Sequence, residues 1–272
     1  LLNGENAFNG GQNNTFLDTS TNGHSITRNG NVTQGSFSPF SVDDGKWGNY
    51  FSGTNASDYL TTGTTSDWKF LSDGLGDYTV EFWAYVQSTN ASNTATIVAT
   101  SGGSSTVGAN LVFGDSIGFR LVMNRGSSGN QTFVGTGQVN FNQWYHVAFT
   151  VNGSTAKAYL DGVLKNTTTL IFNNTNPTYT LHIGNWGESG TLPLDGFISN
   201  LRITKSIVYN GNFTAPTNPL TAIANTELLT CQSNRFKDNS GNGFTFNING
   251  DVRVQPFSPF PQTTAYDASQ NG

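Results

Sequence analysis

Short runs of alternating apolar and polar residues, separated by Gly, Asn, Ser and Asp, extend over most of this 272-residue chain. Alternation with a period of two indicates β-strands, whereas the 3.6-residue period of an amphipathic helix is nearly absent. We expect the clearest strands at residues 78–86, 96–100, 110–113, 118–124, 131–135, 144–151, 156–160, 178–183 and 196–204. The pattern predicts an all-β fold, and the length suits one large sandwich.

The strand expected at residues 78–86 carries apolar residues on both faces. Its two alternating sets are Tyr78, Val80, Phe82, Ala84 and Val86 on one side, and Thr79, Glu81, Trp83 and Tyr85 on the other. Such a strand suits the centre of a two-layer antiparallel sandwich.

Turn residues divide the expected strands. Asn152-Gly153 and Asp161-Gly162 each stand between two strands and predict type I′ hairpin turns, which need positive φ at both central residues. Residues 205–225 break the alternation, and Pro216 and Pro219 exclude a regular central strand there. We expect a short helical turn or an extended wrap along the edge of the sandwich.

Residues 236–260 repeat the pattern of residues 16–40. Both copies share a Phe-x-Asp-x-Ser-x-Asn-Gly stretch, and both end on Phe-Ser-Pro-Phe, at 37–40 and 257–260. Internal repetition is strong evidence of modular organisation. We therefore expect one module over residues 1–215. Residues 216–272 would then be a linker plus a second copy of the opening strands, which docks on a neighbouring unit.

Composition excludes several classes of function. Only 11% of residues are charged, against about 25% in typical domains, and the net charge is −5 without a basic cluster. Binding to nucleic acid through phosphate neutralisation is therefore excluded. The sequence has neither a signal peptide nor an apolar run of transmembrane length, so we expect no membrane insertion. We interpret the chain as a mature or trimmed part of an extracellular protein, on a cell surface, a fibre or a virion exterior.

Cys231 is the only cysteine, so an internal disulfide is impossible. A single cysteine is either a small buried apolar residue or, in an exported protein, half of an intermolecular bridge. Both interpretations are open at this point.

Asn-x-Ser/Thr sequons recur along the chain and make N-glycosylation a candidate modification for a secreted protein. The candidate asparagines are Asn13, Asn31, Asn55, Asn90, Asn130, Asn152, Asn166, Asn173 and Asn212. Chance occurrence in an Asn- and Thr-rich sequence is the alternative.

Four stretches resemble the laminin-G-like jelly rolls of the concanavalin A-like lectin/glucanase superfamily. They are 18–23 (DTSTNG), 50–60 (YFSGTNASDYL), 77–83 (DYTVEFW) and the group 144–148 (WYHVA), 159–162 (YLDG) and 195–203 (DGFISNLRI). The resemblance implies a two-sheet antiparallel jelly-roll sandwich. It also implies that the segment at Asp18 is an edge strand, which pairs with later strands including the one at Asp195.

Many members of this superfamily bind Ca²⁺ near the opening strand. Asp18, Asn22 and Asp195 stand at the matching positions, and Asp238 and Asn242 repeat the first two. Ser199-Asn200 replaces the acidic residue usual after Asp195, which weakens the match. The alternative is that Asp18 and Asn22 only organise an Asx-turn before Gly23. Calcium is the cofactor that the resemblance implies.

Enzymatic activity is not expected. Glucanases of the superfamily use two carboxylates on one strand face, but Glu81 stands alone in its strand. The G-x-S-x-G elbow of a serine hydrolase is also missing. His146 and His182 lie within expected strands, where they serve a sheet face.

Sugar binding needs an exposed aromatic platform with polar groups around it. Trp83 and Trp144 lie within strands and are expected in the core. Trp186, in a Gly-rich loop, is the best platform candidate, but the sequence favours the alternative that this loop tryptophan caps the core.

The leading interpretation is a non-enzymatic structural module that assembles head to tail with copies of itself. Its C-terminal copy would donate strand and anchors to the next unit through Phe236, Asp238, Phe257, Pro259 and Phe260. The alternative is a carbohydrate-binding, lectin-like module with glycans as partners.

Overall fold

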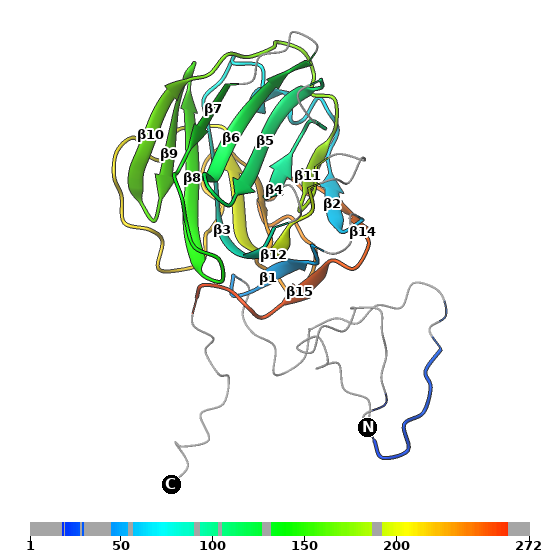
Figure 1. Cartoon of the computed structure of the whole chain (residues 1–272). Helices are drawn as coiled ribbons and strands as arrows, with labels where there is room; N and C mark the ends of the chain where they lie inside the picture. Colours follow the sequence, from blue (N-terminus) through cyan, green and yellow to red (C-terminus); the bar gives the residue numbers. More distant parts are fainter. Residues whose placement is uncertain are drawn as a thin grey trace.

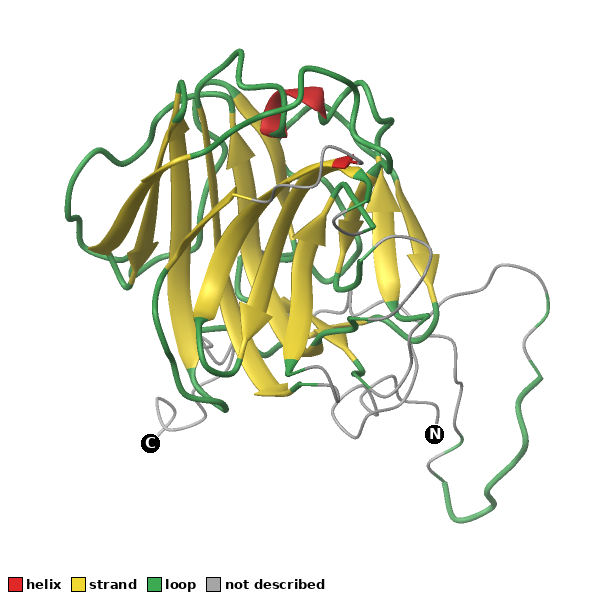
Figure 2. Ribbon diagram, turned by 45° about the horizontal axis from the view of Figure 1, so that its top comes forward, coloured by secondary structure: helices red, strands yellow, loops and turns green. Residues whose placement is uncertain are grey.

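Strands with a high content of β-branched and aromatic residues, broken by glycine turns, build two antiparallel sheets packed face to face (Figures 1 and 2). The computed structural model describes residues 18, 20–27, 29, 45–53, 57–89, 93–102, 105–126, 132–186 and 192–260. The predicted all-β sandwich is confirmed. In the described residues, no helix is both long and apolar enough to cross a membrane.

The larger sheet has eight strands. Its order is β10 (Val163–Thr169), β9 (Thr155–Leu160), β8 (Trp144–Asn152), β3 (Tyr78–Ser88), β12 (Asp195–Thr204), β1 (Gly48–Phe51) and β15 (Arg253–Gln255), with β13 (Thr226–Thr230) also paired to β12. Both predicted turns join strand pairs, and the type I′ prediction is confirmed at Asp161-Gly162, whose φ angles are 49° and 80°. Between β8 and β9 the type I′ prediction is wrong, because Asn152 is the last residue of β8, paired with Thr155, and only Gly153 in this turn has positive φ, 56°.

The smaller sheet has seven strands. Its order is β14 (Phe246–Asn249), β2 (Tyr59–Thr62), β11 (Leu181–Ile183), β4 (Thr94–Ala99), β5 (Val107–Gly114), β6 (Gly118–Arg125) and β7 (Thr132–Gly135). A short 3-10 turn, η2 (Lys69–Leu71), lies between β2 and β3.

The core lies between the sheets, and β3 contributes the set that its alternation predicts. Tyr78, Val80, Phe82, Ala84 and Val86 are all buried in the core. The opposite set points away from the core, to the outer face of the larger sheet. Trp83 and Trp144 belong to that outer face and are only half-buried, so their expected place in the core is wrong.

Residues 205–225 form the extended wrap, not the helical turn. The segment crosses the outer face of the larger sheet, where Thr79 donates to the Ser206 carbonyl at 2.8 Å and Lys157 Nζ donates to the Asn210 carbonyl at 2.7 Å. Cys231 lies just beyond it and is fully buried, and burial raises the pKa of its thiol. The buried interpretation of Cys231 therefore holds.

Residues 226–260, here called the closing segment, complete the sheets of their own chain. β13 pairs with β12, β14 pairs with β2, and β15 pairs with β1. Figure 1 shows β14 and β15 in orange beside the blue β2 and β1. This corrects the expectation that the C-terminal copy docks on a neighbouring unit. It also corrects the expectation that the Asp18 segment supplies the edge strand beside β12, because β1 pairs there.

Complementary contacts hold the closing segment. Asp58 accepts the backbone N–H of Asp251 at 2.8 Å, directly beneath the turn at Gly250, whose φ is 66°. Any Cβ at Gly250 would lie 2.0 Å from Asp58 Oδ1, so only glycine fits. Because the segment is tethered to the site it fills, its effective concentration there is high, which favours closure within one chain.

Candidate functional site

A row of aromatic residues crosses the outer face of the larger sheet, one from each of four neighbouring strands. In register, Tyr50 of β1 faces Phe197 of β12, Phe197 faces Tyr85 of β3, and Tyr85 faces Trp144 of β8. Ring centroids along this row are 5.0, 6.1 and 5.6 Å apart. We call these four residues the aromatic row. Side chains directly across antiparallel strands stabilise each other.

The closing segment adds a further aromatic ring, that of Phe257, which packs on the aromatic row. Phe257, from the repeated Phe-Ser-Pro-Phe motif, lies 4.7 Å from Phe197, 5.1 Å from Tyr85 and 5.2 Å from Trp144. Its ring remains 37% exposed. Phe260, at the other end of the motif, is buried against Trp83 with ring centroids 5.8 Å apart.

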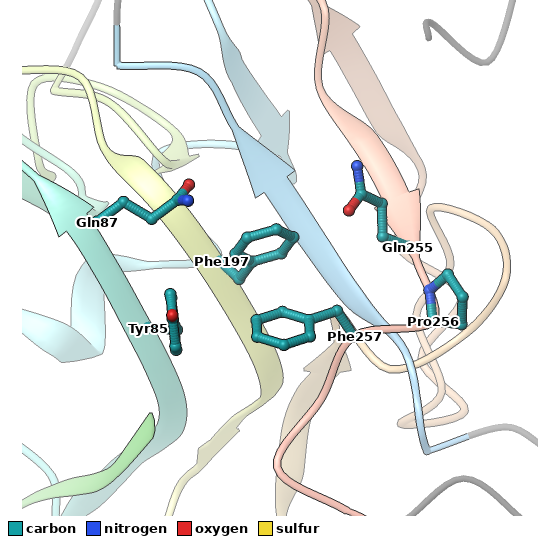
Figure 3. A pocket seen from close by; sticks show the side chains of 6 residues that line it. All are labelled: Tyr85, Gln87, Phe197, Gln255, Pro256 and Phe257. Carbon is teal, nitrogen blue, oxygen red and sulfur yellow. The ribbon is translucent and has the colours of Figure 1, made fainter. Parts of the chain in front are cut away.

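A groove of about 290 Å³ opens beside Phe257 (Figure 3). Its lining residues come from three separate parts of the chain and are Tyr85, Gln87, Phe197, Gln255, Pro256 and Phe257. The Gln87 and Gln255 amides stand on opposite sides of the phenyl rings in Figure 3. Within the described part of the chain, neither amide side chain has a hydrogen-bond partner. Each therefore has a donor and an acceptor to offer a ligand.

Charged groups surround the Tyr50 end of the aromatic row. The Arg253 guanidinium lies over the Tyr50 ring at 5.6 Å. Burial, and next the charge of Asp195, raise the pKa of Tyr50. Burial also raises the pKa of Asp58, against the hydrogen bonds that it accepts from the Asp251 and Ser52 amides.

Glu81, the lone acid of β3, is fully buried and fully partnered. It accepts from Arg202 Nε at 2.9 Å and from the Tyr209 hydroxyl at 2.8 Å, and it lies 3.3 Å from His146 Nε2. The wrap residue Tyr209 covers this cluster. Burial alone would raise the pKa of Glu81, but the His146 hydrogen bond and the Arg202 charge lower it below the ordinary value. Glu81 thus joins sheet and wrap.

The structure does not bring the three predicted calcium ligands together. Asp18 and Asn22 lie in a segment outside the sandwich, whereas Asp195 begins β12 (Figure 1). The Asp18 carboxylate accepts the amides of Ser20 at 2.8 Å and His24 at 2.9 Å, as the Asx-turn interpretation expects. In the described residues, no group of three or more His, Cys, Asp or Glu is placed to hold a metal ion.

The second copy of this turn has a defined structural task. Asp238 accepts the amides of Ser240 at 2.8 Å and Phe244 at 3.2 Å, which repeats the Asp18 arrangement. Asn242 Nδ2 donates to the Glu227 carbonyl of β13 at 2.8 Å. Within the closing segment, the turn therefore fastens the residues around Asn242 to β13.

The residues expected to mediate assembly all lie in their own module. Phe236 packs against the core, Asp238 and Phe260 are buried, and Pro259 is half-buried. Phe257 is the one that also borders the groove.

Trp186 lies beyond β11 in the smaller sheet, away from the groove. Its ring is half-buried, and a Cβ on Gly102 would lie 3.3 Å from its Nε1 and 2.6 Å from the Tyr179 ring. This tight packing resembles a cap on the sandwich. Its use as a sugar platform remains a prediction.

The sequons divide by accessibility. Asn152, Asn166 and Asn212 are exposed, whereas Asn173 is half-buried and its Nδ2 donates to the Arg125 carbonyl at 3.2 Å. The remaining candidates, Asn13, Asn31, Asn55, Asn90 and Asn130, lie outside the described residues. Glycosylation stays a prediction, favoured at the first three positions.

Sequence reasoning missed the groove. Tyr85 was assigned to the correct face, but nothing in the sequence aligned it with Tyr50 and Phe197 or set Gln87 opposite Gln255. The one available signal was the repeated Phe-Ser-Pro-Phe, whose Phe257 borders the groove.

Comparison with known proteins agrees with this architecture. The profile of the concanavalin A-like lectin/glucanases superfamily matches residues 52–208. A putative carbohydrate-binding protein from Bacteroides ovatus superposes with a TM-score of 0.54 and 18% identity, over 79% of this chain and 61% of that chain. The heptameric SAP-like pentraxin from Limulus polyphemus superposes with a TM-score of 0.50 and 16% identity, over 79% and 96% of the two chains.

No curated protein matches in sequence. Identities this low show a common fold alone, and this chain spans only 61% of the Bacteroides ovatus protein. The profile match covers more than half of the 272 residues. This chain belongs to the concanavalin A-like lectin/glucanases superfamily.

Proposed function

We propose that this protein is a non-enzymatic, extracellular carbohydrate-binding module whose glycan site is the groove at Phe257. One observation carries the proposal. An exposed aromatic ring stands between two unpartnered amides, Gln87 and Gln255, on a sheet face. Aromatic surface with a few convergent polar groups is the composition that sugar rings require. The superfamily and the putative carbohydrate-binding neighbour support it.

A non-enzymatic role is supported by the state of Glu81. Acid catalysis on glycosides needs two carboxyl groups that reach the same bond. Glu81 is buried under the wrap and is committed to Arg202, His146 and Tyr209.

The test is glycan-array screening of the full chain, followed by calorimetric titration of Gln87→Ala and Gln255→Ala. A hydrogen bond contributes about 0.5–1.5 kcal/mol net, so each variant should bind about 2- to 13-fold more weakly. The matched control is Gln138→Ala, an exposed glutamine after β7. Unchanged affinity in both groove variants, or binding lost only in Trp186→Ala, would refute the groove as the site.

Assembly with copies of itself is a second candidate function. It would depend on the N-terminal copy of the repeat, not on the C-terminal copy. The closing segment already fills its site, and the Asp18 turn has the same hydrogen bonds as the Asp238 turn. On this proposal, the opening copy of the repeat, which begins with the Asp18 turn, is the segment that a second copy of this chain would bind.

We expect assemblies, if this candidate holds, to vanish in the full-length variant Phe37→Ala/Phe40→Ala, whereas glycan binding persists. Sedimentation velocity and electron microscopy measure the size and shape of the particles. A wild-type chain that stays monomeric at high concentration would eliminate this candidate and leave the glycan site untouched.

A further inference from the structure

The groove has no charged side chain in its lining. Its polar groups are two carboxamides and the Tyr85 hydroxyl, and its remaining walls are Phe197, Pro256 and Phe257. A carboxamide offers both a donor and an acceptor, which matches sugar hydroxyls. Acidic sugars need a cation, ideally the forked guanidinium of arginine, for their carboxylate or sulfate.

Carboxylates flank the groove. Asp195 begins β12 two residues before Phe197, and it accepts a 2.5 Å hydrogen bond from Ser88, the chain neighbour of Gln87. It is also close enough to Tyr50 to disfavour the phenolate. An anionic group placed beside Gln87 would therefore meet a like charge.

Arg253, two residues before Gln255 in β15, is a cation beside Tyr50, and it does not reverse this balance. It lies over Tyr50 at 5.6 Å, and its charge acts on Asp58, which Asp251 also approaches. The charges of two carboxylates, Asp195 and Asp58, and of one guanidinium thus act on Tyr50, and Asp251 lies beside Asp58. The whole chain adds a net charge of −5, which also disfavours the approach of anions.

We propose that the groove is selective for uncharged sugars, one or two pyranose rings at a chain end, and discriminates against sialylated, uronic and sulfated forms. The inference rests on the proposed glycan-binding function. Its size limit follows from the volume of about 290 Å³, just below the range of about 300–1,000 Å³ for ligand pockets. Asp195 is the residue that produces the discrimination.

The test uses the full chain and pairs of short oligosaccharides that differ only in a terminal acidic group. The probes are neutral galactose-, glucose- and mannose-ended chains beside their sialylated, glucuronylated or sulfated counterparts. We expect the neutral partner of a pair to bind at least 10-fold more tightly. The affinity for the neutral partner should change less than 2-fold between about 20 mM and 500 mM salt. Over this range the Debye screening length falls from roughly 20 Å to 5 Å.

Asp195→Asn isolates the mechanism, because it removes the charge but keeps an acceptor oxygen for Ser88. We expect the affinity for the acidic partner to rise about 3- to 10-fold and the affinity for the neutral partner to change little. An effect of this size is typical of one nearby charge. Asp73→Asn is the control. It lies before the start of β3, whereas Tyr85 and Gln87 lie near that strand's end.

The outcomes separate the two claims. If no glycan binds, the proposed function falls and this inference with it. If acidic glycans bind as tightly as neutral ones, or if Asp195→Asn leaves the ratio unchanged, only the selectivity argument is overturned. The selectivity argument is supported if the wild-type chain binds only neutral glycans and if Asp195→Asn lowers the ratio of neutral to acidic affinity.

Discussion

Glu81 keeps its charge at a fully buried position because three side chains converge on it. Arg202, His146 and Tyr209 come from β12, β8 and the wrap, so the cluster ties three chain segments to the outer face of one sheet. Removing one member of a buried pair leaves the other charge uncompensated, which destabilises a protein by about 3–5 kcal/mol.

We therefore predict that Glu81→Gln lowers the free energy of unfolding by about 3–5 kcal/mol at pH 7, measured by urea titration. Glu227→Gln is the matched control. Glu227 pairs with Lys205 at 2.9 Å, but the lysine is 43% exposed. Exposed pairs contribute about 0–1 kcal/mol. Equal losses in the two variants would contradict a structural role for the cluster.

The same substitution predicts a pH dependence. The pKa of Glu81 is lowered in the folded state from its ordinary value of 4.5. Stability from such a group is fully present above the ordinary pKa and is lost as pH falls through the folded-state pKa. The gap between wild type and Glu81→Gln should thus be constant from pH 7 to about 5 and narrow below it. A gap that stays constant down to pH 3 would rule out this linkage.

At the scale of elements, β14 and β15 depend on the turn that joins them. Gly250 has φ of 66°, and a Cβ there would lie 2.0 Å from Asp58 Oδ1 and 2.8 Å from the Ser57 carbonyl. Both strands are edge strands, each held by a single partner, so the turn contributes strongly to their position.

Gly250→Ala should therefore destabilise the protein more than Gly153→Ala, which has φ of 56° and open space around its Cβ. Positive φ alone costs alanine about 1–2 kcal/mol, and the collision at Gly250 adds to it. Thermal unfolding measures the difference. Hydrogen exchange should be faster in β14 and β15 and unchanged in β5 and β6. Equal effects of the two substitutions would mean that the turn can shift without strain.

At the scale of the whole molecule, the closing segment connects fold and function. It adds a strand to an edge of each sheet, and it supplies Gln255, Pro256 and Phe257 to the groove. The proposed glycan site therefore forms only when this segment is in place. Weakened glycan binding should accompany any variant that loosens β15.

The sequence alone determined the all-β class, the positions of both hairpin turns and the two faces of β3. These features depend on residues close together in the chain, namely period-two alternation and the positive φ of glycine after Asn or Asp. The buried state of Cys231 was also one of its two predicted alternatives.

Only the tertiary structure decided which of two similar segments closes the sandwich. The sequence presents both copies as equivalent, and the choice depends on contacts such as Asp58 beneath Gly250, across residues far apart in the chain. The aromatic row and the groove have the same origin. Strand register is a long-range property, and a shift of one residue would turn Tyr50, Phe197 or Tyr85 to the other face of the sheet.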